Sequence, residues 1–228
     1  MPRETLDRQI HQLQDEVLLL GSMIEQAMSD AVDALNRRDL ESARFVYNGD
    51  QQINEKRFAI ENATLILIAT QQPMAHDLRF LAAIMEVITE LERMGYYAKG
   101  IARITIRLNE ENVTLPSREF TRMAELAVGM LHRALSAFIT EDTQLALSIP
   151  PEDNEVDDLY NKVYRRLVTD MIANPETIDR TNLLMSVSHN LERMADRVIN
   201  ICERTIFIAT GELLELASSD EEDKLDGG

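Results

Sequence analysis

Apolar residues recur every three or four positions along the first half of the chain, which is the spacing of one buried face of an α-helix. This pattern predicts three long amphipathic helices, over about 13–35, 39–70 and 75–108. Asp39 stands where a carboxylate would cap the second helix, and Pro73 marks the end of that helix. The inner stripe of the third helix comprises Leu81, Ile84, Ile88, Leu91, Gly95, Ala98 and Ala102.

The second half of the chain repeats this organisation after a polar segment. Residues 109–117 read NEENVTLPS and are expected to form a linker. Three further helices are predicted at about 118–140, 142–173 and 177–210. The pair Pro150–Pro151 should kink or restart the middle one, because proline lacks a backbone donor and clashes with the preceding turn.

The two halves align with each other as copies of one unit. A shift of 103 residues places Asp39 on Asp142 and Asp50 on Asp153. Farther along, a shift of 100 residues superposes two identical Leu-Glu-Arg-Met segments. We therefore predict an all-α fold of two tandem three-helix bundles, six long helices in all, packed side by side. The predicted domains are 1–108 (first bundle), 109–117 (linker), 118–211 (second bundle) and 212–228, an acidic tail that we expect to be disordered.

The amino-acid composition and net charge exclude several classes of function. With 40 acidic and 23 basic residues, the chain has a formal charge of −17 and should repel nucleic-acid phosphates and anionic lipid headgroups. The single cysteine, Cys202, excludes an internal disulfide and a cysteine-rich zinc site, and we expect it to be a packed thiol. Residues 1–12 lack the apolar core of a signal peptide, and no apolar stretch is long enough to cross a membrane, so we expect a cytoplasmic location.

Pairs of carboxylates one helical turn apart are the candidate chemical groups. Asp50 lies on an apolar stripe, and its repeat mate Asp153 is followed one turn later by Asp157. Glu192 and Asp196 form a second pair of this kind. Like charges at this spacing cost roughly 0.2–0.5 kcal/mol in an isolated helix, and a bound cation would reverse the sign. A set of oxygen ligands suits magnesium, manganese or iron.

Ordinary explanations compete with a metal site. Glu152 and Asp153 follow Pro151 and could simply occupy the first turn of a helix, where acidic residues are favoured. Arg193 lies three residues before Asp196 and could pair with it. Acidic pairs are also common in a chain with 40 acidic residues.

The signatures of several enzyme classes are missing from the sequence. No histidine follows a glutamate by three residues, so the Glu-x-x-His pattern of ferritin-like di-iron bundles is absent. His189 could be a metal ligand, although a histidine on a polar face is the more common role. The chain also has no glycine-rich phosphate loop and no Gly-x-Ser-x-Gly motif. We therefore expect no enzymatic activity. The alternative is a metal-dependent hydrolase or oxidase that uses the carboxylates.

Three segments carry a resemblance to a known family. Residues 68–79 read IATQQPMAHDLR, and residues 92–98 read ERMGYYA. In the second copy, residues 191–203 read LERMADRVINICE. These segments resemble the signature of the PhoU family, and the resemblance covers about residues 5–211.

The resemblance implies pseudo-twofold symmetry between the bundles and no catalytic centre. It implies a negative regulator of the phosphate-starvation response that couples the phosphate ABC transporter, through its ATPase subunit, to a sensor histidine kinase. A regulator of another phosphate carrier is the alternative, and a homo-oligomer, with a dimer favoured, is expected. The motif residues that would contact a partner or cross-link helices are Pro73, Asp77, Arg79, Glu92, Arg93, Arg193, Asn200 and Glu203.

Metal binding is a further property that the resemblance implies, because some family members hold iron or zinc with acidic pairs from two helices. Transferred onto this sequence, the first set is Asp50/Asn54 with Glu92/Tyr96, and the second is Asp153/Asp157 with Glu192/Asp196. Since Asn54 and Tyr96 replace two carboxylates, any iron, zinc, manganese or magnesium ion should prefer the second half. The upstream motif of the second copy has become Asp179-Arg180-Thr181, so its role there is open.

Overall fold

The computed structural model describes residues 2–108 and 114–216, and all regular structure in these two ranges is helical. The long helices are α1 (Pro2–Arg37), α2 (Leu40–Gln71), α3 (His76–Arg107), α4 (Ser117–Thr140), α6 (Asp153–Ala173) and α7 (Ile178–Thr210). A short α5 (Thr143–Ser148) and two 3₁₀ turns, η1 (Pro150–Glu152) and η2 (Pro175–Thr177), complete the set. The predicted linker and tail fall largely on residues 109–113 and 217–228, which lie outside the described ranges.

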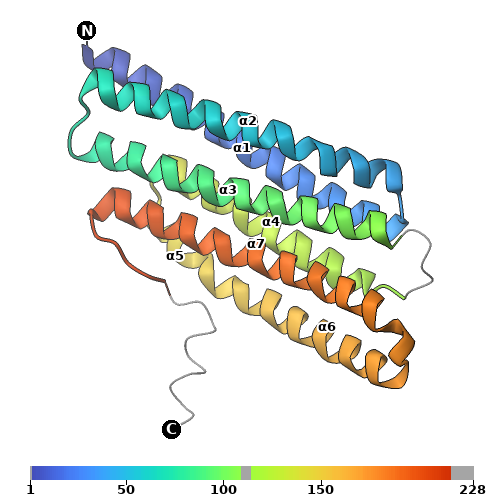
Figure 1. Cartoon of the computed structure of the whole chain (residues 1–228). Coiled ribbons are helices and arrows are strands. Elements are labelled where there is room, and N and C mark those ends of the chain that lie inside the picture. Colours follow the sequence, from blue (N-terminus) through green and yellow to red (C-terminus); the bar gives the residue numbers. More distant parts are fainter. Residues whose placement is uncertain (1, 109–113, 217–228) are drawn as a thin grey trace.

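The helices form two bundles that lie side by side. Helices α1, α2 and α3 make the first, and α4, α6 and α7, with the short α5, make the second. Figure 1 shows α3 and α7 adjacent in the middle, flanked by α2 and α6, with α1 and α4 behind them. The predicted all-α fold of two tandem three-helix bundles is therefore confirmed.

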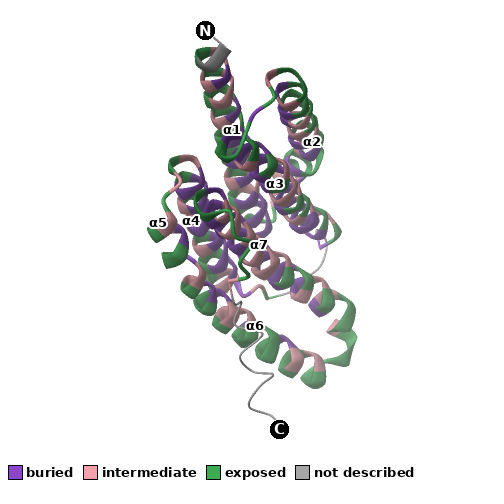
Figure 2. Cartoon of the chain, turned by 90° about the vertical axis from the view of Figure 1, so that its left-hand side faces the viewer, coloured by how far each residue is buried: buried purple, intermediate pink, exposed green. Residues whose placement is uncertain are grey.

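A single hydrophobic core runs through both bundles. The predicted inner stripe of α3 is buried along its whole length, and so is the face of α1 that begins at Leu13 (Figure 2). Phe80 of α3 stacks on Phe138 of α4 with 5.3 Å between ring centroids, which joins the two bundles through aromatic packing. Burial of such side chains contributes about 1.5–3 kcal/mol each. Separation of the bundles would therefore expose core surface.

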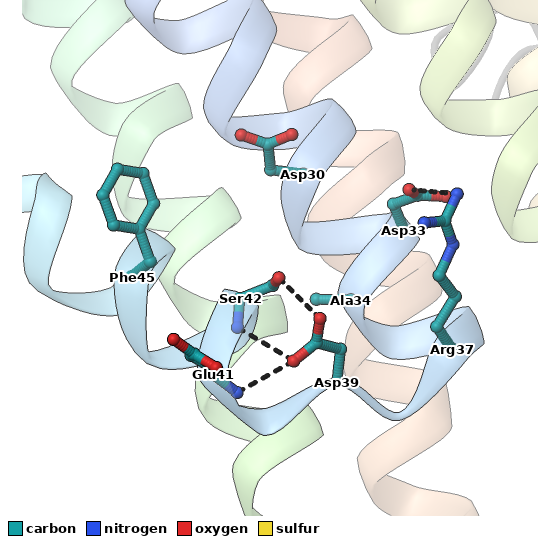
Figure 3. A pocket seen from close by; sticks show the side chains of 8 residues that line it. All are labelled: Asp30, Asp33, Ala34, Arg37, Asp39, Glu41, Ser42 and Phe45. Carbon is teal, nitrogen blue, oxygen red and sulfur yellow. Dashed lines mark hydrogen bonds and ion pairs between the residues drawn. The ribbon is translucent and has the colours of Figure 1, made fainter.

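The turn that follows the first helix is duplicated in detail. Asp39 accepts hydrogen bonds from two backbone N–H groups in the first turn of α2 at 3.0 and 3.1 Å (Figure 3). Asp142 caps α5 in the same way, with both bonds at 3.0 Å. The residue before each cap is left-handed, with φ of 55° at both Arg38 and Glu141. The repeat seen in the sequence thus extends to backbone conformation.

The halves differ where the sequence places two prolines. Helix α2 is continuous, whereas the equivalent part of the second bundle is divided into α5, η1 and α6 at Pro150–Pro151, as predicted. The restart makes Asp153 the first residue of α6. Beyond α7, residues 212–216 are described, and Leu216 packs against the core.

Candidate functional site

The first candidate site lies between α2 and α3, around Asp50. Asp50 is buried, with 7% of the whole residue's surface exposed. Lys99 Nζ donates to Asp50 Oδ2 at 2.7 Å, and Asn54 Nδ2 donates to the same oxygen at 3.3 Å. The hydrogen bond from Lys99 to Asp50 raises the pKa of the lysine above its usual value, more than burial lowers it. The ammonium also lies 5.2 Å from the centre of the Tyr47 ring.

The other two predicted members of this set lie on α3. Glu92 is half-buried, and the side chain of Tyr96 is mostly exposed. Lys99 follows Tyr96 by three residues and Glu92 by seven, so all three lie near one line along the helix. Sequence reasoning missed Lys99, although the repeat alignment contains a signal, since a shift of 100 places this charged residue on the apolar Ile199.

The second candidate site lies between α6 and α7. Asp153 begins α6 with only 2% of its surface exposed, and Asp157 follows one turn later, half-buried. On α7, the side chains of Glu192 and Asp196 are 15% and 32% exposed. Ile199 is buried here, so the position that holds an ammonium in the first bundle is apolar in the second.

Two basic side chains lie beside the α7 acids. His189 Nδ1 is 3.3 Å from Glu192 Oε2, and burial lowers the pKa of His189, with the charge of Arg193 acting in the same direction. Arg193 Nε lies 3.9 Å from Asp196 Oδ2, too far for a hydrogen bond. The expected pairing of Arg193 with Asp196 is thus a loose contact.

The side chains of residues 2–108 and 114–216 bring no three His, Cys, Asp or Glu residues into one group that could hold a metal ion. Around Asp50, the lysine and the amide donor both occupy one of the two carboxylate oxygens, Oδ2, which leaves a cation fewer ligands. In the second bundle four carboxylates lie on two neighbouring helices, and oxygen donors of this kind suit a hard cation, although the described side chains do not bring three of them into one group. Metal binding in the second bundle therefore stays a prediction.

A neighbouring ion pair fixes the start of α6. Arg133 of α4 holds Glu152 with both terminal nitrogens, and the Nη2–Oε2 distance is 2.6 Å. This hydrogen bonding lowers the pKa of Glu152 below its usual value. Glu152 thus faces α4 while Asp153, the next residue, is buried. The interpretation as a first-turn residue therefore holds for Asp153, which begins α6, whereas Glu152 lies in η1 and pairs with Arg133.

The family-motif residues of the first copy hold helices together. Arg79 Nε donates to the backbone carbonyl of Ile208 at 3.1 Å, which links α3 to the C-terminal end of α7. Asp77 is buried in the first turn of α3, and Pro73 lies in the turn between α2 and α3. Arg93 is the more exposed residue, and its guanidinium lies 3.9 Å from Glu90.

The motif residues of the second copy lie under the segment that follows α7. Glu203 Oε1 accepts the backbone N–H of Leu216 at 2.8 Å, and its other oxygen lies 3.7 Å from Arg204. Asn200 lies one turn before Glu203 and lines the same shallow hollow as Glu215 and Leu216. The chain after α7 therefore folds back along α7.

Polar contacts join the first part of α3 to the last part of α7. Arg197 donates to Glu90 at 3.2 Å, and Arg204 lies 2.9 Å from Glu86. Together with the bond from Arg79 near the start of α3, these contacts show that α3 and α7 run antiparallel. They join residues that are more than 100 positions apart in the sequence, so no local sequence pattern could have predicted them.

Two copies of a three-helix unit, packed with α3 antiparallel to α7, define a class of duplicated helical-bundle proteins. The PhoU domain model matches the chain twice, at residues 6–105 and 120–205. The chain belongs to the PhoU family. No helix of the described residues is both long enough and apolar enough to cross a membrane.

Relatives agree with this assignment over nearly their full length. A phosphate-specific transport system accessory protein PhoU homolog from Streptococcus pneumoniae serotype 4 is 34% identical, over 94% of this chain and 99% of the relative. A homolog of the same name from Caulobacter vibrioides NA1000 is 38% identical over 87% of each chain. The crystal structure of the phosphate transport system regulatory protein PhoU from Streptococcus pneumoniae superposes with a TM-score of 0.86 at 33% identity, covering 92% of this chain and all of that one.

Proposed function

We propose that this chain is a non-enzymatic accessory protein of phosphate transport that acts by binding other proteins. The observation that carries the proposal is the match of both bundles to the PhoU domain, together with full-length similarity to relatives named as accessory proteins of the phosphate-specific transport system. The solved relative is named a regulatory protein, and none of these names describes an enzyme. The burial of Cys202 also removes the one thiol nucleophile.

The partners in this proposal are the ATPase subunit of the phosphate ABC transporter and a sensor histidine kinase, with the chain on the cytoplasmic side as a negative regulator of the starvation response. A face of α2 supports binding to another protein, because Phe58, Leu65 and Ile66 are each at least half exposed there. The charge of −17 favours a basic protein surface over a nucleic acid. A homodimer is the proposed oligomeric state.

A single hard cation in the second bundle is a further part of the proposal. Asp153 and Asp157 of α6, with Glu192 and Asp196 of α7, would hold it. A bound ion would neutralise the carboxylates and tie α6 to α7. Loss of chelator-reversible metal in the double substitution Glu192→Ala and Asp196→Ala is the expected result, and retention of that metal would refute the assignment.

The test of the accessory role is a deletion of the gene in the source organism, followed by rescue with the wild-type chain. A reporter of phosphate-starvation genes should be active in phosphate-replete medium after deletion and repressed again after rescue. The charge reversal Arg93→Glu should weaken the rescue, since Arg93 is the most accessible of the motif residues on α3. Arg103→Glu, an exposed arginine of the same helix, is the matched control and should rescue fully. An unchanged reporter after deletion would contradict the role.

A further inference from the structure

The buried carboxylate of Asp50 already has a cation within the chain. Lys99 Nζ lies 2.7 Å from Asp50 Oδ2, and the Asp50 side chain is 9% exposed against 29% for the lysine. Asn54 turns its amide nitrogen, and not its oxygen, toward the same carboxylate oxygen at 3.3 Å. All the groups that converge on this oxygen are therefore donors, which is the arrangement that a carboxylate without a metal ion requires.

The second bundle lacks this cation at the equivalent position. The mate of Lys99 is Ile199, which is 3% exposed and packs as a core residue. The mates of Asn54 and Tyr96 are the carboxylates of Asp157 and Asp196. The two bundles thus differ in a correlated way: the half that has lost two acidic residues has gained an ammonium, and the half that keeps four acidic residues has none there.

We propose that the ammonium group of Lys99 is the built-in cation of the first bundle and fills the place beside Asp50 that a divalent metal ion would take, so that the first bundle binds no such ion. The inference stands apart from the proposed accessory role, because it concerns only how the first bundle balances its buried charge.

Electrostatics explains why the ammonium group of Lys99 and a divalent metal ion cannot both occupy the place beside Asp50. A buried carboxylate needs a partner charge, and a lysine tethered on the facing helix supplies one without the entropic cost of capturing a free ion. A divalent ion at Asp50 would lie within a few ångströms of the ammonium and be repelled by it. Only one carboxylate oxygen would remain for it, together with the half-buried Glu92. The ring of Tyr47 also covers the ammonium and favours it at this position.

The decisive experiment restores the composition of the second bundle in the first. The full chain with Asp153→Asn and Asp196→Asn serves as the background, so that the second bundle no longer contributes a site. Onto it are placed Lys99→Ile, Asn54→Asp and Tyr96→Asp together. Bound manganese is measured by equilibrium dialysis and elemental analysis. The background should bind no manganese, and the added triple substitution should create a site for one equivalent and raise the melting temperature in manganese.

A matched control uses another ion-paired lysine. Lys56 of α2 pairs with Glu16 of α1, and Lys56→Ile in place of Lys99→Ile should create no site. Two outcomes overturn the proposal: manganese bound by the background and lost on Asp50→Asn, or a folded triple variant that binds no more than the Lys56 control. Because the background has no second site, neither outcome depends on whether the second bundle binds metal.

A second measurement covers the case in which the triple variant does not fold. Lys99→Ile alone leaves Asp50 without its cation and should lower the melting temperature by about 5 °C. Adding Asp50→Asn should recover at least half of that loss, because the neutral amide no longer needs a counter-charge. If the double variant is as unstable as Lys99→Ile alone, the ammonium does not neutralise Asp50 and the proposal is wrong.

Discussion

Arg197 Nε donates to the hydroxyl of Tyr97 across 3.4 Å, although the two residues occupy equivalent positions in the two repeats. Repeat mates can meet only near the pseudo-twofold axis, so the axis passes between α3 and α7 at this pair. The stack of Phe80 on Phe138 lies on the same interface between bundles. The two repeats are therefore halves of one packed unit, much as two subunits form a symmetric dimer.

A close approach between α1 and α4 depends on a glycine. A Cβ atom at Gly21 would lie 2.1 Å from Cδ1 of Leu135, which is buried. Alanine favours a helix over glycine by about 1 kcal/mol, yet overpacking costs about 1–3 kcal/mol. We expect Gly21→Ala to lower the free energy of unfolding, measured in urea, by up to about 2 kcal/mol.

Gly129 of α4 is the matched control for this substitution. A Cβ atom there meets nothing within 4 Å, so Gly129→Ala should be neutral or stabilise by about 0.4–1 kcal/mol. Gly21→Ala with stability equal to that of Gly129→Ala would show that the α1–α4 contact tolerates the methyl group.

The duplicated helix caps should each contribute to stability. Asp142→Ala removes the carboxylate that accepts two backbone N–H groups of α5 and should cost about 0.5–2 kcal/mol. Asp142→Asn keeps an acceptor oxygen and should lose much less. Urea denaturation of both variants provides the comparison, and equal stability of the two would argue against the cap.

The ion pair of Arg133 and Glu152 should stabilise the fold in a pH-dependent manner. The folded state lowers the pKa of Glu152 below its usual value of 4.5, so the contribution is fully present above that pH and is lost as the pH falls through the folded-state pKa. Glu152→Gln should therefore reduce stability at pH 7 and show a shallower loss between about pH 5 and pH 3 than the wild type. Parallel acid-limb curves for the two proteins would mean that the pair adds nothing.

Cys202 should be chemically inert in the folded protein. Burial, with the charge of Glu203 acting in the same direction, raises the pKa of its thiol to about 12. Iodoacetamide at pH 8 should leave the native chain unmodified and label it once it is unfolded in urea, because only the thiolate reacts. Rapid labelling of the native chain, followed by mass spectrometry, would contradict the packed position.

Local signals in the sequence predicted much of the fold. Asp39 and Asp142 cap helices by contacts within three residues, and Pro150–Pro151 interrupts the helix in which it lies. Each of these features can therefore be predicted from a short stretch of sequence. The alignment of Asp50 with Asp153 rested on the repeat, which the fold confirms.

Contacts between residues that are far apart in the sequence could not be predicted from it. Arg79 and Ile208 are 129 residues apart, and their hydrogen bond depends on the register of α3 against α7. The pairing of Lys99 with Asp50 depends in the same way on the register of α2 against α3. Side-chain spacing within a helix shows which residues share a face, but not which partner stands opposite.

The measurement that tests the central claim most directly is affinity purification of the full tagged chain from phosphate-replete cells, with quantification of the phosphate transporter's ATPase subunit. An accessory protein that acts by binding should enrich this subunit about tenfold or more over an untagged strain. The Arg103→Glu control should retain the enrichment and Arg93→Glu should lose part of it. No enrichment of the subunit with the wild-type chain, in replete or starved cells, would contradict the account.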